Sequence, residues 1–125
     1  MSAPDPVIVK IPVSEISDWE SFHTVFARVL GFPAFYGRNM NAWVDCMESI
    51  DSPSHGMTSV HAPEGGMLVM DLGVCTEFAQ RCPEQYEAIL DSTGFVNYAR
   101  IDIGQKPVLG LSFWNQQPLL AQKKT

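Results

Sequence analysis

Residues 33–47 read PAFYGRNMNAWVDCM, a loop that leads into a short amphipathic helix. Pro33 prevents a preceding helix from continuing, and Asn39 is a residue type that commonly caps a helix N-terminus. With about 100° between successive residues, the predicted helix has an apolar face and an adjacent polar face. The apolar face holds Met40, Trp43, Val44 and Met47, and the polar face holds Asn41, Asp45 and Glu48. The stretch therefore predicts a helix that is packed on one side and solvated on the other.

The sequence before this stretch predicts a strand and a helix. Residues 7–13, VIVKIPV, are β-branched and apolar, which is typical of a buried parallel strand. Ser17 and Glu20 fit a capping box at the start of the helix, and Gly31 supplies a left-handed cap at its end. His23 is interpreted as a partly buried packing residue beside an apolar stripe. That stripe is formed by Phe22, Val25, Phe26, Val29 and Leu30.

The sequence after this stretch predicts a long loop, two strands and an interrupted helix. Residues 51–66 carry turn formers throughout and are interpreted as an exposed loop. Residues 67–72 and 107–113 are short apolar runs typical of strands, and residues 76–100 have a helical pattern that Pro83 breaks by starting a new helix. The resulting order is βααβαβ. Strands separated by helices favour an α/β fold, with a small three-stranded parallel sheet packed by helices through right-handed crossovers.

Length and composition narrow the classes of partner and compartment. A chain of 125 residues predicts one domain, which we place at residues 1–114, with a flexible tail at residues 115–125. Eight Lys and Arg against fourteen Asp and Glu give a net charge of −6, which disfavours nucleic acid or a membrane as partner and suits a basic protein. The sequence shows no secretory signal and no apolar run long enough to span a membrane. Its three cysteines include no CxxC pair and are interpreted as reduced thiols, so we expect a cytoplasmic protein.

No motif of catalysis, phosphate binding or metal binding is present. The sequence lacks GxGxxG, GxxxxGK[ST] and HExxH. His55 and His61 lie six residues apart, a spacing that matches no common zinc site, and Cys46 is interpreted as a small buried hydrophobe. We therefore predict no catalytic residue, no metal ligand and no cofactor.

A protein-binding surface is the alternative to catalysis that the residues favour. Phe35 and Tyr36 are consecutive aromatics beside a predicted turn at Gly37, and they border the polar face of the predicted helix. Aromatic anchors contribute strongly to the stability of protein interfaces. A merely solvated helix face is the competing interpretation, and composition alone favours it.

The same stretch resembles the signature of the barstar family, the intracellular inhibitors of barnase-type ribonucleases. That signature runs Tyr-Gly-x-Asn-Leu-Asp-Ala-Leu-Trp-Asp-Cys and follows a proline and an aromatic residue. Met40 is a conservative replacement within it, and the order of elements is similar over residues 7–114. The identical residues are Pro33, Tyr36, Gly37, Asn39, Ala42, Asp45 and Cys46.

The resemblance implies a cofactor-free inhibitor, or immunity protein, that blocks the basic active site of a ribonuclease with carboxylates. The family's principal carboxylate falls on Asp45, and a later acidic position falls near Asn97. Here Asn41 replaces a carboxylate, Val44 removes an aromatic, and Glu48 adds a negative charge, so a ribonuclease other than barnase or another basic toxin is expected as the target. The implied partner-binding residues are Phe35, Tyr36, Gly37, Asn39, Asn41, Val44, Asp45, Glu48 and Asn97.

Two other functions remain compatible with the sequence. One is a non-inhibitory interaction module of the same fold, which binds an endogenous protein or itself. The other is a small enzyme that uses Cys46, Asp45 and a histidine of the 51–66 loop. For the leading interpretation, we expect the free protein to be a monomer.

Overall fold

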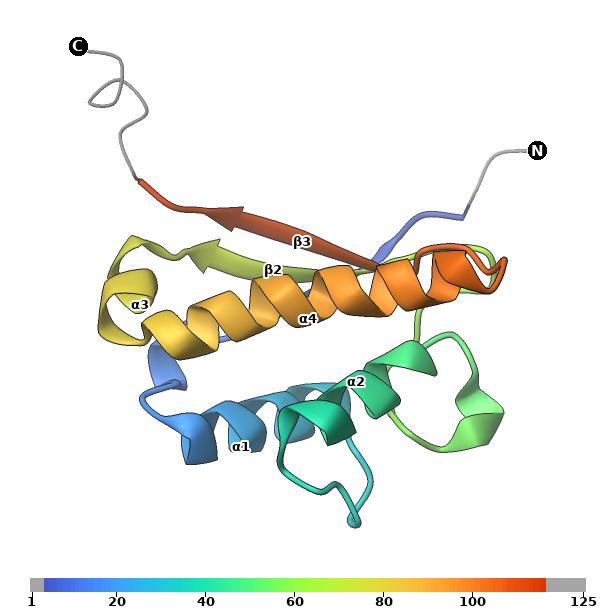
Figure 1. The fold of residues 1–125 in the computed structure, drawn as a ribbon, viewed down its shortest axis with the longest axis horizontal. Coiled ribbons are helices and arrows are strands. Elements are labelled where there is room, and N and C mark those ends of the chain that lie inside the picture. The colour runs from blue at the N-terminus through green and yellow to red at the C-terminus, as the bar shows by residue number, and fades with distance from the viewer. Residues whose placement is uncertain (1–3, 117–125) are drawn as a thin grey trace, which may run out of the picture.

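Three parallel strands form one sheet in the order β1-β2-β3, as a computed structural model that describes residues 4–116 shows (Figure 1). The strands are β1 (Val7–Lys10), β2 (Leu68–Val74) and β3 (Leu109–Trp114). The register places Leu68 beside Val7 on one side and beside Leu109 on the other. The predicted α/β class and three-stranded parallel sheet are thus confirmed, and every strand end lies within three residues of the predicted one.

Four α-helices connect the strands. They are α1 (Trp19–Leu30), α2 (Met40–Glu48), α3 (Thr76–Arg81) and α4 (Pro83–Asp102), with 3-10 turns η1 (Val13–Glu15) and η2 (Pro53–His55). Pro83 occupies the first position of α4, so the interrupted helix becomes two and the α-helix and strand order is βααβααβ. Both crossovers join neighbouring strands in the same direction, and right-handed crossovers of this kind bring all helices to one face of the sheet, as Figure 1 shows.

Within residues 4–116, no helix covers the other face of the sheet, which corrects the prediction of a buried first strand. Side chains of β1 alternate between half-buried and exposed, and Ile8 is 64% exposed. On β2, by contrast, Leu68, Met70 and Leu72 face the helices and are buried. The apolar run of β1 therefore reflects strand propensity as well as burial, because only every second residue of a strand points to the covered face.

The ends of α1 agree with the prediction at one terminus and differ at the other. Asp18, and not Ser17, is the N-cap, and its carboxylate accepts a hydrogen bond of 2.8 Å from the Ser21 amide. The reciprocal contact comes from the Ser21 side chain, so the capping box lies one residue later than predicted. Gly31 has φ 68° and caps the C-terminus as predicted, and a Cβ there would lie 2.4 Å from Ser59.

That contact with Ser59 shows that the loop predicted over residues 51–66 is exposed only in part. The Ser59 amide donates a hydrogen bond of 2.9 Å to the Leu30 carbonyl at the end of α1. The Ala62 amide donates one of 3.0 Å to the Ile50 carbonyl, and the side chains of Thr58 and Ala62 are buried. This segment is part of the packed structure, although it contains only the η2 turn.

The start of the predicted flexible tail is held by two hydrogen bonds. Asn115 donates to the Tyr86 hydroxyl at 3.3 Å, and the Gln116 amide donates to the Thr76 hydroxyl at 2.8 Å. Residues 117–125, which make up the rest of that prediction, lie outside the described residues. Over residues 4–116, no helix has the length and hydropathy needed to cross a membrane.

Candidate functional site

The buried side of α2 fixes the direction of its polar face. The Asn39 side chain accepts a hydrogen bond of 2.8 Å from the Ala42 amide, which caps the helix as predicted. Trp43 and Met47 are fully buried, and the Trp43 ring packs edge-on against Phe26 at 5.7 Å. The opposite side consequently faces outward: Asn41 and Asp45 are exposed, and Glu48 and Val44 are half-buried.

This outward face is one wall of a groove between α2 and α4, with a volume of about 560 Å³. From α2 it is lined by Met40, Asn41, Val44, Asp45 and Glu48. From α4 it is lined by Asp91, Ser92 and Phe95. The predicted residues of α2 are thus brought together in what we call the α2–α4 groove. The three α4 residues were not predicted, although the spacing of Asp91 and Phe95 places them one turn apart on the same side of a helix.

Three carboxylates of the α2–α4 groove carry charge that the described part of the chain does not neutralise. The ion pairs within residues 4–116 are Arg28–Glu15, Arg81–Glu77 and Arg100–Asp51. None of these pairs includes a residue that lines the groove. Asp45, Glu48 and Asp91 therefore form a negative surface. In a site of this kind, a positively charged group from outside is attracted.

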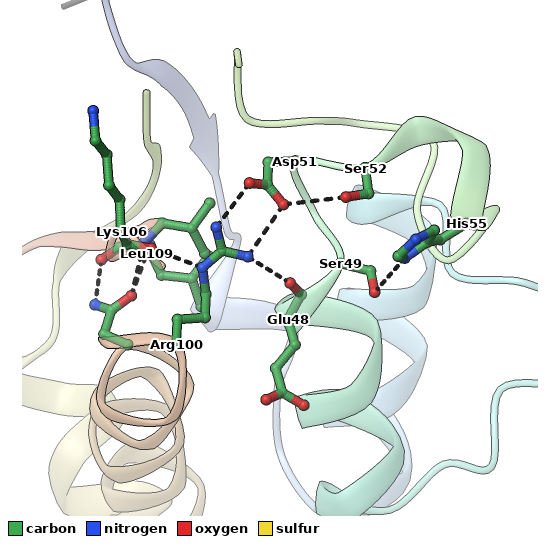
Figure 2. Close-up of polar contacts among 10 residues, drawn as sticks. Glu48, Ser49, Asp51, Ser52, His55, Arg100, Lys106 and Leu109 are labelled. Atoms are coloured by element: carbon green, nitrogen blue, oxygen red, sulfur yellow. Dashed lines mark hydrogen bonds and ion pairs between the residues drawn. The ribbon is translucent and has the colours of Figure 1, made fainter. Parts of the chain in front are cut away.

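Arg100 of α4 holds the two walls of the groove together (Figure 2). Its guanidinium donates hydrogen bonds of 2.9 Å to the Glu48 carbonyl and 2.8 Å to the Lys106 carbonyl, and it contacts both carboxylate oxygens of Asp51 at 2.8 and 3.2 Å. The Arg100 side chain is buried. Because it connects α4, the C-terminal end of α2 and the start of the 51–66 segment, Arg100 sets the position of one helix against the other. No pattern in the sequence predicted the ion pair between Arg100 and Asp51, because the two residues lie far apart in the chain.

The two aromatic residues of the preceding loop have different environments. Phe35 is 75% exposed, which satisfies the expectation that at least one of them is accessible. Tyr36 is only 9% exposed, and its hydroxyl is hydrogen-bonded to Nδ1 of the buried His23 at 2.5 Å. Burial raises the pKa of Tyr36 above its usual range, so this hydroxyl stays protonated. Tyr36 thus anchors the loop to α1, and Phe35 is the exposed aromatic of the pair.

Arg38 fixes the same loop from its other end. It adopts φ 53°, and its guanidinium donates hydrogen bonds of 2.9 Å to the Glu20 carbonyl and 2.8 Å to the Thr24 hydroxyl of α1. The neighbouring Gly37 and Asn39 are exposed. The position of Arg38 against α1 explains why a cation within this loop does not pair with the carboxylates of α2.

Asn97, a predicted partner-binding residue, is half-buried and has a role inside the fold. Its side-chain oxygen accepts hydrogen bonds from the Val108 and Leu109 amides at 3.0 and 3.1 Å. Its side-chain nitrogen donates to the Leu109 carbonyl at 2.8 Å. Both ends of the amide are therefore occupied by the backbone at the start of β3, and the acidic residue of α4 that faces α2 is Asp91.

The residues of the enzyme alternative do not form a reactive centre. Cys46 is buried, and burial together with the charge of Asp45 raises the pKa of its thiol to about 11, so it is not an activated nucleophile. The rings of His55 and His61 are hydrogen-bonded to the hydroxyls of Ser49 and Thr58. All three cysteines are free and buried, and residues 4–116 contain no group of three or more side chains suited to hold a metal ion.

Comparison with known proteins identifies a family. A family model described as Barstar (barnase inhibitor) matches residues 7–98 of the chain. The match begins with β1 and extends into α4, and it includes the 33–39 loop and all of α2. A comparison with curated proteins gave no significant match.

Proposed function

Because this chain belongs to the barstar family, whose members are non-enzymatic inhibitors, we propose that it inhibits a basic ribonuclease or related nuclease toxin by filling the active site with the acidic face of α2. A ribonuclease active site binds RNA phosphate with cationic side chains. Carboxylates on a rigid helix can occupy the same cations through short, charge-assisted hydrogen bonds.

The exposure of Asp45 carries this proposal. Its side chain is exposed on α2, and no cation of residues 4–116 forms an ion pair with it. Its charge is therefore free for a partner. Glu48 extends the negative surface along the helix, Asn41 supplies a neutral hydrogen-bonding amide, and Phe35 is an exposed aromatic anchor at the border.

The departures from the family signature favour a target other than barnase. Asn41 lacks the charge of the family's carboxylate, and Val44 lacks the aromatic ring next to Asp45, whereas Glu48 adds a charge one turn along the helix. Because its carboxylates and aromatic rings are placed differently from those of the family signature, α2 should prefer a partner whose cations are also placed differently. We propose that the inhibitor acts in the cytoplasm and binds this partner as a monomer.

Substitution of Asp45 tests the proposal. Asp45→Ala is expected to weaken the complex by about 2–5 kcal/mol, partly because a partner cation is left buried and unpaired. Titration calorimetry measures the loss with barnase and with the basic ribonucleases of the source organism, and an RNA-cleavage assay measures inhibition by the unsubstituted protein.

Asp102→Ala is the matched control, because Asp102 is exposed on α4 and does not line the α2–α4 groove. A loss at Asp45 no larger than that at Asp102 contradicts the role of α2. Binding without inhibition of RNA cleavage supports the alternative of a non-inhibitory interaction module.

A further inference from the structure

We propose that Leu119 and Leu120, in the segment that follows β3, pack onto Val74 and Trp114 at the carboxyl end of the sheet. We call these two sheet residues the β2–β3 patch. The inference concerns the sheet face opposite the helices and not α2, so it stands independently of the proposed function.

The alternation of side chains along β3 places Trp114 on the sheet face opposite the helices. The ring of Phe113 lies 6.1 Å from the ring of Tyr86 on α4, so Phe113 faces the helices. Successive side chains of a strand point to opposite faces, and Trp114 therefore points away from the helices. In agreement with this direction, Trp114 is 60% exposed.

An irregularity in β2 brings Val74 to the same face. Leu72 is buried against the helices, and regular alternation would direct Val74 to the helices as well. The register between β2 and β3 shifts between Asp71 and Gly73, where Gly73 adopts φ 68°. After the shift Val74 pairs with Trp114, and paired residues of neighbouring strands share a face. Val74 is 65% exposed, so the two residues form an apolar patch in contact with solvent.

The chain leaves the described part of the structure beside the β2–β3 patch. The amide of Gln116, the last described residue, donates a hydrogen bond of 2.8 Å to the hydroxyl of Thr76, two residues beyond Val74. Residues 117–125 follow. Leu119 is three residues beyond Gln116, and three extended residues span about 10 Å, which is about twice the distance between neighbouring strands. The patch is therefore within reach of the leucines.

Asn115 offers a hydrogen-bond acceptor that suits a reversal of the chain at this point. Its side-chain nitrogen donates to the Tyr86 hydroxyl at 3.3 Å, whereas its buried side-chain oxygen has no partner among the described residues. An asparagine side-chain oxygen commonly accepts from the backbone amide two residues later, which here belongs to Gln117. A buried acceptor without a donor is costly, and the following Pro118 is a residue type common in turns. The sequence after β3 thus favours a turn over a continued strand.

The composition of residues 117–125 favours their own chain as the surface that they bind. The segment contains the apolar pair Leu119 and Leu120, two lysines and no acidic residue, whereas the whole chain has a net charge of −6. The segment is therefore attracted to the rest of the chain, and a short link gives it an effective concentration on the order of millimolar. A second copy that binds the same patch has no such link and is repelled by the net charge of the first.

A spin label on the segment tests its position. A nitroxide reagent should react selectively with the thiol of a Gln122→Cys variant of the full chain, because the native cysteines are buried. NMR measures the paramagnetic broadening of the Val74 methyl signals and the Trp114 indole signal relative to the chemically reduced label. We expect strong broadening of both signals and weak broadening of Ile8, which lies on the other edge strand.

Variants of the segment and of the patch locate the contact, each with a matched control. In the labelled chain, Leu119→Ser combined with Leu120→Ser is expected to reduce the broadening several-fold, and Ala121→Ser is expected to leave it unchanged. Trp114→Thr is expected to reduce the broadening of β2 signals several-fold. Ile8→Thr is its control, because Ile8 is 64% exposed on the same sheet face and is not part of the patch. Unchanged amide spectra away from each substitution establish that the variants are folded.

Two outcomes would overturn this inference. Equal broadening with and without the two leucines would show that the link to β3, and not a contact, keeps the label near the patch. Broadening in a mixture of spin-labelled chains and isotopically enriched chains without a spin label would place the segment on a second copy. We expect that mixture to show none. Neither measurement involves α2, so a failure here leaves the proposed inhibition untouched, and a failure of inhibition leaves this contact untouched.

Discussion

The contact between His23 and Tyr36 joins α1 to the loop that precedes the proposed binding face. Both side chains are buried, and the Trp19 ring stacks on the imidazole at 6.0 Å. Burial disfavours the charged form of the imidazole, and the positive charge of Arg38 disfavours it further, so the pKa of His23 is lowered from its usual value. The folded protein therefore holds His23 neutral at a pH where the unfolded chain already binds a proton.

This difference predicts that His23 makes folding depend on pH. With the unfolded pKa near 6.5, the stability that neutral His23 contributes is complete above that pH, and it is lost as the pH falls through 6.5 toward the lower folded pKa. Urea unfolding at several pH values should show the stability difference between the wild type and His23→Gln shrinking as the pH falls from about 7 to 5. Carboxylates titrate in both proteins and cancel in the difference. A difference that stays constant over this range contradicts the prediction.

Single residues were predictable where helical periodicity alone fixes the direction of a side chain. Asp45 and Asn41 follow from the pattern of Trp43 and Met47, because the apolar residues of a short helix determine which side is buried. The role of Asn97 could not be predicted, since its hydrogen-bond partners lie on β3 and no local pattern indicates which strand a helix contacts.

The nine residues of α2 are too few to form a stable helix in isolation, so this element depends on its contacts. The Asn39 cap and the buried Trp43 stabilise its first turns. At its other end the cation of Arg100 binds the carbonyl of Glu48, a favourable arrangement for the last turn of a helix. The element that carries the proposed binding face is thus held by a side chain from a different element.

Removal of this side chain should be far more costly than removal of an exposed one. Arg100→Met is expected to destabilise the protein by roughly 3 kcal/mol, because it leaves Asp51 half-buried without a partner and the Glu48 carbonyl without a donor. Arg28→Met is the control: its pair with Glu15 is exposed on both sides, and a loss of about 0.5 kcal/mol or less is expected. Urea unfolding measures the free energy of unfolding that each variant loses. Losses of equal size would show that Arg100 has no special role.

Elements were predictable where the sequence contains its own start and stop signals. Gly31, Asn39 and Pro83 each lie at the helix end where the sequence placed them. The N-cap of α1 was predicted one residue too early, because Ser17 and Asp18 are both residue types that commonly cap a helix N-terminus. The packing of residues 51–66 was missed because turn formers indicate only a change of direction, and the partners Leu30 and Ile50 belong to other segments.

The arrangement of helices on one side leaves the whole molecule with two unlike surfaces. The helical side carries the carboxylates of the α2–α4 groove, and the other side is the sheet face with Ile8 and Lys10, which no helix of residues 4–116 covers. The order of strands and helices predicted the parallel sheet. It did not predict that α4 lies beside α2, and it therefore could not predict a groove that needs both helices.

These surfaces predict that the free protein does not self-associate. A net charge of −6 with unpaired carboxylates on the helical side repels a second copy, and Ile8 is flanked on β1 by half-buried Val7 and Val9 and by Lys10. Sedimentation equilibrium at low and moderate salt should give the monomer mass of 13.9 kDa, and one molecule should bind one ribonuclease. A stable dimer that buries α2 would contradict both this prediction and the proposed mode of inhibition.

The burial of all three native thiols makes the open sheet a convenient point of attachment. Ser112 is exposed on β3, and Cys46, Cys75 and Cys82 are buried, so a maleimide should react selectively with the thiol of a Ser112→Cys variant. A chain immobilised through that position on a sensor chip would present α2 to the solution, because the sheet and α2 lie at opposite sides of the fold (Figure 1). The same architecture thus offers a uniformly oriented reagent for capturing and ranking nucleases.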